Sequence, residues 1–452
     1  MNCKTIIGLE VHVELKTKSK MFCNCSADYF GQKPNTRTCP VCLGLPGTLP
    51  VPNQQAIDWC ILIGLALNCS IPTLSKFDRK NYFYPDLPKG YQISQYDQPF
   101  CLNGSIEVNG KKIRIRRVHM EEDTAKLTHQ FGNQKSKIKN QNDESYSLID
   151  FNRSGVPLVE IVTEPDFDNA KEVKEYLQKL QQIVRYLKVS DADMEKGQMR
   201  LEPNISLREM SSQKSVDSKQ LPSYKVEVKN INSFSFVEKA INFEIQRQLE
   251  ILKKGQTPVQ ETRGWDENLQ KTVSQRVKEE ANDYRYFPEP DIPPFKWKES
   301  EIDKLKEELP ELPDDKVVRF KKQYSISVYD SEILSRDTNL ANYFEEAVKV
   351  AQDKVTPKQI ANYIINKKAN IDEVLPAKFV EDILISLKTE KIDEDELKKV
   401  IHKVLSNNPK IREDYKKGKT NALQFAIGQV MYIIKKKIDT EKLKDLILEE
   451  IK

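Results

Sequence analysis

Apolar and ionisable side chains alternate strictly over residues 6–15. Every second position is apolar: Leu9, Val11, Val13 and Leu15. The positions between them carry titratable groups: Glu10, His12 and Glu14. Because successive side chains of a strand point to opposite faces, this pattern predicts a strand with one buried face and one row of ionisable groups. Neighbours in that row lie about 6.5–7 Å apart, close enough to share a metal ion or a polyphosphate, although a solvated sheet face is the alternative.

Later segments extend this polar face. Strands are predicted over 112–120, 158–162, 200–208 and 225–229. Glu160 interrupts an apolar strand, and a carboxylate buried there needs a divalent ion or an arginine. Glu121 and Glu122 follow another strand and precede a third acid, and adjacent carboxylates repel unless a cation is present. A solvated turn is the alternative at that point. Several strands with ionisable faces would make a suitable floor for a metal–nucleotide site.

Helical periodicity sets the fold class. It predicts a helix capped by Asn53, a helix over 170–187, and a helix that starts at Ser235 and stops at Gly255. After the prolines near residue 293 the chain is mostly helical, with one long helix over 331–352. We therefore expect an α+β protein: a mixed or antiparallel sheet domain, 1–293, then an all-α region divided into 294–400 and 401–452.

Four cysteines form two closely spaced pairs. Cys23 and Cys25 are separated by one residue, and Cys39 and Cys42 by two. This spacing predicts a zinc-ribbon-like insertion with four thiolate ligands, and such a closed site is structural rather than catalytic. An iron–sulfur cluster and free thiols are the alternatives, and a disulfide is disfavoured in a cytosolic chain.

A proline- and glycine-bounded loop at 77–90 places aromatic rings beside two cations. Arg79 and Lys80 could hold phosphate while Tyr82 and its neighbours stack on a base. Arg285 lies between two tyrosines in a similar setting. The alternative is that these rings fill a neighbouring core.

Composition and charge limit the compartment and the partners. The longest apolar run, 59–67, is too short to cross a bilayer, so we expect no membrane partner. The chain begins directly with the predicted strand, so the cytoplasm is the expected compartment. Residues 401–452 carry 12 Lys and Arg against 7 Asp and Glu. A basic end on a nearly neutral body suggests a polyanionic partner, with a solvated helical surface as the alternative.

Standard nucleotide-binding and nucleophile motifs are absent. Gly418, Lys419 and Thr420 resemble the end of a P-loop, but Glu413 stands where that motif requires its first glycine. No G-x-S-x-G or G-x-G-x-x-G occurs either. Any use of ATP is therefore expected to depend on a metal site on the sheet.

The longer motifs, taken in order, resemble the B-subunit family of the heterotrimeric aspartyl/glutamyl-tRNA amidotransferases. The resemblance covers nearly the whole chain. The matching stretches are 7–15, 75–97, 119–126, 149–166, 190–208, 226–234, 283–294 and 414–431.

The resemblance implies a cradle-like N-terminal domain that uses ATP and Mg²⁺ to phosphorylate the side-chain carboxylate of misacylated Glu-tRNA(Gln) or Asp-tRNA(Asn). Ammonia from a partner amidase, the A subunit, would then displace the phosphate. A small C subunit would complete the complex, and the helical region would grip the tRNA. The cytoplasm is the expected compartment, with an organelle as the alternative, because amidotransferases of this family also work in some organelles.

The residues and the resemblance together give the expected site. The catalytic and metal-binding set is Glu10, His12, Glu122 and Glu160, with Glu121 and Glu202 as second choices. Relatives usually carry Asp at the position of Glu202. A direct His12 ligand would favour Mn²⁺ over Mg²⁺ or an outer role for this histidine. The expected phosphate or acceptor-end contacts are Arg79, Lys80, Tyr82 and Arg285. The competing function is a zinc-ribbon RNA-binding module without catalysis.

The tRNA contacts are expected in the basic tail. The candidates are Lys416, Lys417, Lys419, Lys435, Lys436 and Lys437. Replacing residues 435–437 with glutamine is expected to weaken tRNA binding and to flatten its salt dependence, by roughly 0.9 in the slope of log K against log salt for each phosphate contact that the substitutions remove. Binding titrations at several salt concentrations measure this slope. An unchanged slope would show that these lysines do not touch the tRNA backbone.

Overall fold

The computed structural model describes residues 2–130, 146–210, 221–277, 284–367, 370–387, 394–416, 421–434 and 440–451. The chain divides into two compact units, residues 1–315 and 316–452, and each is described by itself.

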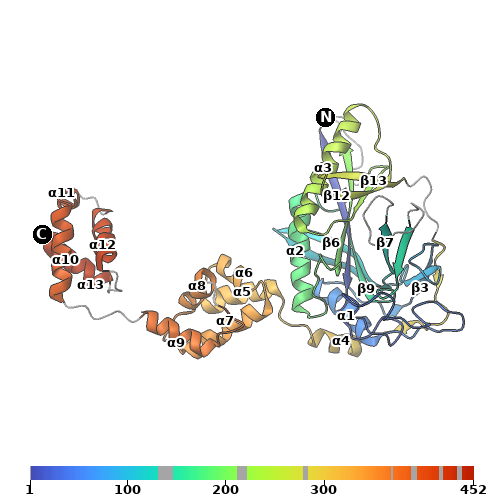
Figure 1. Cartoon of the computed structure of the whole chain (residues 1–452), viewed down its shortest axis with the longest axis horizontal. Coiled ribbons are helices and arrows are strands. Elements are labelled where there is room, and N and C mark those ends of the chain that lie inside the picture. The colour runs from blue at the N-terminus through green and yellow to red at the C-terminus, as the bar shows by residue number, and fades with distance from the viewer. Residues whose placement is uncertain are drawn as a thin grey trace, which may run out of the picture. The chain divides into compact units, whose positions relative to one another are not determined.

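An eight-stranded sheet forms the centre of the first unit, in the order β13-β12-β11-β10-β1-β9-β6-β5 (Figure 1). Its strands, in chain order, are β1 (Cys3–Glu14), β5 (Cys101–Val108), β6 (Lys111–Glu122), β9 (Pro157–Thr163), β10 (Met199–Glu209), β11 (Val226–Lys229), β12 (Glu261–Asp266) and β13 (Lys271–Val277). Neighbours pair antiparallel except β11 and β12, which are parallel, so the sheet is mixed. The strand predicted from the alternation at 6–15 is confirmed as β1.

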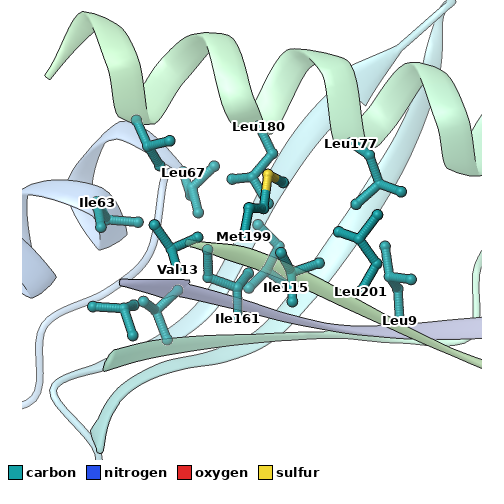
Figure 2. Close-up of a cluster of buried hydrophobic side chains, with 14 of the residues drawn as sticks. Leu9, Val13, Ile63, Leu67, Ile115, Ile161, Leu177, Leu180, Met199 and Leu201 are labelled. Atoms are coloured by element: carbon teal, nitrogen blue, oxygen red, sulfur yellow. The ribbon is translucent and has the colours of Figure 1, made fainter. Parts of the chain in front are cut away.

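Three helices cover the apolar face of this sheet: α1 (Gln54–Ala66), α2 (Ala170–Tyr186) and α3 (Phe234–Lys253) (Figure 1). The side chains of Asn53 and Asn169 accept backbone N–H groups at the starts of α1 and α2, so both helices have polar caps. Figure 2 shows Leu177 and Leu180 of α2 above Leu9 of β1 and the strands beside it. The short helix α4 (Glu299–Glu307) adds Ile302 and Leu305 to the same core.

Short strands form three smaller sheets. These are β14 (Phe287–Pro288) with β3 (Asp78–Asn81) and β4 (Tyr91–Ser94), β15 (Phe295–Lys296) with β2 (Leu74–Ser75), and β7 (Lys126–Gln130) with β8 (Tyr146–Asp150). The loop predicted over 77–90 is therefore partly wrong, because its first residues pair with β4 and β14 as a strand.

Two helix boundaries also differ from the prediction. The cap of α3 is Ser233 rather than Ser235, because the Ser233 hydroxyl accepts the N–H of Phe236 at 3.2 Å. The single helix predicted over 331–352 is two helices, because the Asp337 carboxylate accepts the N–H groups of Asn339 and Leu340 and so begins a new one.

The described part of the second unit is all helical. Its helices are α5 (Pro313–Tyr324, which begins in the first unit), α6 (Val328–Leu334), α7 (Thr338–Ala351), α8 (Pro357–Lys367), α9 (Pro376–Leu387), α10 (Glu394–Asn407), α11 (Lys410–Lys416), α12 (Asn421–Ile434) and α13 (Thr440–Ile451). Buried apolar side chains gather in one cluster over 320–383 and another over 397–451. The expected fold class, a mixed-sheet domain followed by an all-α region, is confirmed. No helix among the described residues is long and apolar enough to span a bilayer.

Truncating the core under α2 tests this packing. Leu180→Ala is expected to destabilise the first unit by about 2–5 kcal/mol, because its side chain is 0% exposed and packs against the sheet. All three tryptophans of the chain, Trp59, Trp265 and Trp297, lie in this unit, so tryptophan fluorescence during urea unfolding reports it selectively. Gln178→Ala, exposed on the same helix, is the control and should stay within about 0.5 kcal/mol of the parent. Equal midpoints for both variants would contradict the packing described.

Candidate metal and phosphate site

The pairing register of β1 carries ionisable side chains onto one face of the sheet. His12 lies opposite Arg200 of β10 on one side and opposite Glu160 of β9 on the other. Glu160 lies in turn opposite His119 of β6. Directly paired residues point to the same face, so side chains from four strands meet there.

Two histidines and two glutamates form the first cluster, which we call the histidine group: His12, His119, Glu121 and Glu160. One ligand atom each from His12, Glu121 and Glu160 lies within 4.8 Å of the other two. The Nε2 atom of His119 is 3.2 Å from Glu160 and 3.5 Å from Glu121, while that of His12 is 3.6 Å from Glu160. His119 and Glu121 are almost fully buried.

In the histidine group, attraction between opposite charges shifts the pKa values more than burial does. Burial alone would lower the pKa of His12, but its hydrogen bond with Glu160 and the nearby carboxylates raise it to about 9. Burial would raise the pKa of Glu121, yet the charge of Lys80 and the hydrogen bond with His119 lower it to about 2. The pKa of Glu160 lies well below its usual range because His119 and His12 overcome the effect of burial.

Three glutamates from adjacent strands form the second cluster, the carboxylate group: Glu10, Glu202 and Glu227, with ligand oxygens within 4.8 Å of one another. Asn204 donates its amide N–H to Glu10 at 3.0 Å, and the Lys229 ammonium lies 2.9 Å from Glu202. Burial and the neighbouring carboxylates raise the pKa of Glu10. Glu202, a second choice among the expected metal ligands, thus lies in this group.

The donor atoms of both clusters fit divalent cations. The carboxylate group offers only oxygen, which Mg²⁺ prefers, and the buried Oδ1 atom of Asn204 beside it has no hydrogen-bond partner among the described residues. The histidine group mixes nitrogen and oxygen, a set that suits Mn²⁺ or Zn²⁺ better. The buried Nδ1 atoms of His12 and His119 also lack hydrogen-bond partners within the described ranges, while the Nε2 atoms of both rings face the carboxylates.

A third set of charges, the arginine group, consists of Glu14, Asp123, Arg153 and Arg200. It lies around Glu14, two residues after His12 on β1, and its acids and arginines pair with one another. The Arg200 guanidinium donates to Glu14 at 3.0 Å and to Asp123, and Tyr29 donates its hydroxyl to Glu14 at 3.0 Å. The pKa of Asp123 lies below its usual range because Arg153 and Arg200 overcome the effect of burial. Burial and the charge of Asp123 raise the pKa of Glu14 to about 8.

Glu122, one of the predicted metal ligands, lies outside both candidate metal clusters. Its carboxylate accepts the backbone N–H of Ile93 at 2.9 Å and pairs with the Lys89 ammonium at 2.6 Å. The neighbouring Glu121 faces the histidine group instead, because successive residues of β6 point to opposite faces.

The predicted phosphate-binding residues take different positions. Arg79 forms a bidentate ion pair with the buried Glu289, at 2.7 and 2.8 Å, so its guanidinium ties β3 to the segment after β14. Lys80 instead points to the histidine group, with Nζ 3.8 Å from Glu121. The ring of Tyr82 lies edge-on to Tyr284, at 5.8 Å between centroids. The carbonyl of Arg285 accepts an amide N–H from the β3 residue Asn81 at 2.8 Å.

The four paired cysteines come together as predicted. The sulfur atoms of Cys23, Cys25, Cys39 and Cys42 lie within 4.8 Å of one another. Four thiols at this separation are compatible with a structural zinc site.

Comparison with known proteins gives the family of this chain. Residues 5–303, well over half of the chain, match the GatB/GatE catalytic domain, and residues 339–451 match the GatB domain. This chain belongs to the GatB family.

Similar proteins extend the match over the whole length. A protein of Thermosipho melanesiensis, named as the B subunit of aspartyl/glutamyl-tRNA(Asn/Gln) amidotransferase, is 46% identical over 99% of this chain and 98% of its own length. A Persephonella marina protein of the same name is 44% identical over the full length of both chains. One from Thermotoga petrophila is 43% identical over 98% of this chain and 97% of its own. The family resemblance inferred from the sequence motifs is thus confirmed.

Sequence reasoning about this GatB-family chain missed two members of the clusters, His119 and Glu227, and the adjacent Asn204. Each lies on a predicted strand, and His119 precedes Glu121 by two residues, which places both on one face. That spacing was a usable signal. Glu227 lies on the ionisable face of the predicted strand 225–229, but only the pairing of β11 with β10 brings it near Glu10.

The lysines expected to contact tRNA fall within the residues that match the GatB domain. Lys417, Lys419, Lys435, Lys436 and Lys437 lie outside the described residues. Lys416 is the last residue of α11, and its side chain is not described.

The raised pKa of Glu14 predicts a pH effect in the metal-free protein. The folded chain holds this proton more tightly than the unfolded chain, so it contributes stability that is lost as pH rises from about 4.5 to 8. Glu14→Gln should therefore gain stability relative to the parent across this window, by at most about 1.4 kcal/mol per pH unit. Urea unfolding followed by tryptophan fluorescence at pH 5 to 8 measures the difference. A stability difference between Glu14→Gln and the parent that does not change with pH would contradict the raised pKa of Glu14. The control is Glu107→Gln, because Glu107 is exposed on β5.

Proposed function

We infer that the polar face of the central sheet activates a carboxylate by phosphorylation. As a member of the GatB family, the chain is the B subunit of a tRNA-dependent amidotransferase that converts misacylated aspartyl- or glutamyl-tRNA into asparaginyl- or glutaminyl-tRNA. The observation that carries the inference is the pair of adjacent clusters, the histidine group and the carboxylate group, built on alternate residues of β1.

The chemistry requires activation because a free carboxylate has only oxide as a leaving group. In the proposed sequence, a substrate carboxylate oxygen attacks the γ-phosphorus of ATP, and ADP departs. Ammonia then attacks the acyl carbon, inorganic phosphate departs, and the nitrogen loses a proton to give the amide. The substrate supplies the first nucleophile and ammonia the second, so the protein needs placement and charge compensation rather than its own serine or cysteine nucleophile.

We propose that the carboxylate group holds Mg²⁺ and that the histidine group holds a second divalent ion, for which Mn²⁺ is an alternative. A bound divalent ion neutralises charge on the transferring phosphoryl group. Glu10, His12 and Glu160 keep their expected ligand roles. Glu121 takes the role expected of Glu122, because the Glu122 carboxylate is bound by Lys89 and a backbone N–H.

Lys80 is the better candidate for a phosphate contact. Its ammonium adjoins the histidine group, whereas Arg79 is held by Glu289. Tyr82 and Tyr284 flank Lys80, whose ammonium lies 6.0 and 5.4 Å from the two ring centroids. We propose that these rings shape the space beside the phosphates, with Arg285 on the same segment as Tyr284.

The proposed partners follow from the family. They are the amidase A subunit, which supplies ammonia, the small C subunit, and misacylated tRNA(Gln), tRNA(Asn) or both. The cytoplasm is the proposed compartment, and the eight cysteines, all free, fit a reducing one.

Removing one charge from the carboxylate group tests this function. Glu10→Gln keeps the size of the side chain but removes a metal-binding charge, so the reconstituted complex should lose about 100-fold or more of its ATP hydrolysis that depends on misacylated tRNA. Phosphate release in the presence and absence of misacylated tRNA measures it. The control is Glu107→Gln, an exposed strand glutamate whose replacement should leave turnover unchanged.

The same assay separates the two candidate functions. If Glu10→Gln turns over normally, the carboxylate group is not part of the reaction. If the parent complex consumes no ATP with misacylated tRNA, the alternative, an RNA-binding zinc-ribbon module without catalysis, is favoured.

A further inference from the structure

Lys20 is a fully buried lysine beside the four-cysteine cluster. Its side chain is 0% exposed. Among the described residues, its ammonium nitrogen contacts the Cys42 sulfur at 3.7 Å and the Phe151 carbonyl oxygen at 3.4 Å, and it forms no ion pair with a carboxylate. Lysine is almost never fully buried unless it is paired with an anion.

The cost of burial identifies that anion. Taking an ammonium out of water costs several kcal/mol, even after the protein relaxes, unless a negative charge compensates for it. A carbonyl oxygen and a neutral thiol supply no such charge. A metal-bound cysteine does, because thiolate is the form that binds zinc. A metal-bound cysteine cluster therefore best explains the buried ammonium beside Cys42.

Lys20 also contacts both pairs of the cysteine cluster, the pair Cys23 and Cys25 and the pair Cys39 and Cys42. Its backbone N–H donates to the carbonyl of Cys25 at 2.9 Å, while its ammonium reaches Cys42 on the other arm. The Cys42 sulfur accepts a second hydrogen bond, from the Cys39 backbone N–H at 3.1 Å. One residue thus contacts a cysteine of each pair.

We propose that Lys20 is the buried counter-cation of the cysteine cluster, donating an N–H···S hydrogen bond that orients Cys42 and helps to keep zinc bound. Four thiolates around one Zn²⁺ leave an excess of negative charge, and a buried ammonium offsets part of it. Lys20 is a positioning residue, because it acts on the metal through a ligand.

The same ammonium connects the cluster to the strand that carries Glu160. Phe151, whose carbonyl it contacts, lies six residues before the start of β9. Met21 donates its N–H to Gly155 at 2.7 Å, and Ser154 donates its hydroxyl to the Cys42 carbonyl at 3.2 Å. The zinc site therefore supports the segment leading into β9, which goes beyond the proposed chemistry and does not depend on it.

Zinc retention tests the proposal directly. In the full chain, purified within its complex, Lys20→Met should bind zinc about 10-fold more weakly or worse, since loss of such an outer contact typically costs 10–100-fold. Zinc per chain, measured after dialysis against a graded series of chelator concentrations, gives the affinity. Lys18→Met is the matched control, because Lys18 is exposed two residues away. Equal retention by Lys20→Met and the parent would overturn the proposal.

A second readout separates charge pairing from simple packing. With Co²⁺ in place of zinc, the sulfur-to-cobalt charge-transfer band should move to lower energy in Lys20→Met, because the thiolate loses a charged hydrogen-bond donor. An unchanged band in a cobalt-loaded variant would overturn the proposal.

A third measurement needs no variant. In the parent chain, zinc removal should expose Lys20 to amine acylation, mapped by mass spectrometry, while Lys18 reacts in both states. Equal protection of Lys20 with and without zinc would contradict the pairing.

Discussion

The register of β1 at the centre of the sheet determines the rest of the site. A slip of one residue would exchange the faces of every side chain on this strand. The buried residues Leu9, Val11 and Val13 prevent that slip, because exposing them to water would cost about 1.5–3 kcal/mol each. The apolar face therefore fixes the polar face, and packing under α1, α2 and α3 holds Glu10, His12 and Glu14 in a row.

Each residue of that row anchors a different set of charges. Glu10 belongs to the carboxylate group, His12 to the histidine group and Glu14 to the arginine group. The carboxylate group crowds three glutamates whose charge Lys229 compensates only in part, whereas the glutamates of the histidine group are paired with His12, His119 and Lys80. The third contains its own arginines and is closed. Uncompensated negative charge is what a divalent cation needs, so the gradient along β1 separates the proposed reacting end from a structural end.

Adjacent residues with similar chemistry take different roles in two places. Glu121 and Glu122 point to opposite sides of β6, so one faces the histidine group and the other meets Lys89. Arg79 and Lys80 are separated in the same way on β3, where the arginine clamps Glu289 and the lysine faces the proposed site. In both pairs the strand register, not the residue type, decides the role. In the zinc-ribbon-like insertion, too, the role of a charged residue depends on its neighbour, because the buried ammonium of Lys20 contacts the sulfur of Cys42.

The sequence by itself determined the strand at the centre, the two-faced sheet, the four-cysteine cluster and the family, because these rest on periodicity, spacing and long motifs. The sequence did not predict the helix starts at Ser233 and Asp337, because several nearby polar residues can cap a helix and only packing selects among them. Only the tertiary structure decided that Glu227 and His119 join the clusters and that Glu122 and Arg79 do not. Those outcomes depend on which strands are neighbours, and a linear sequence records the face of a residue but not the partner across from it.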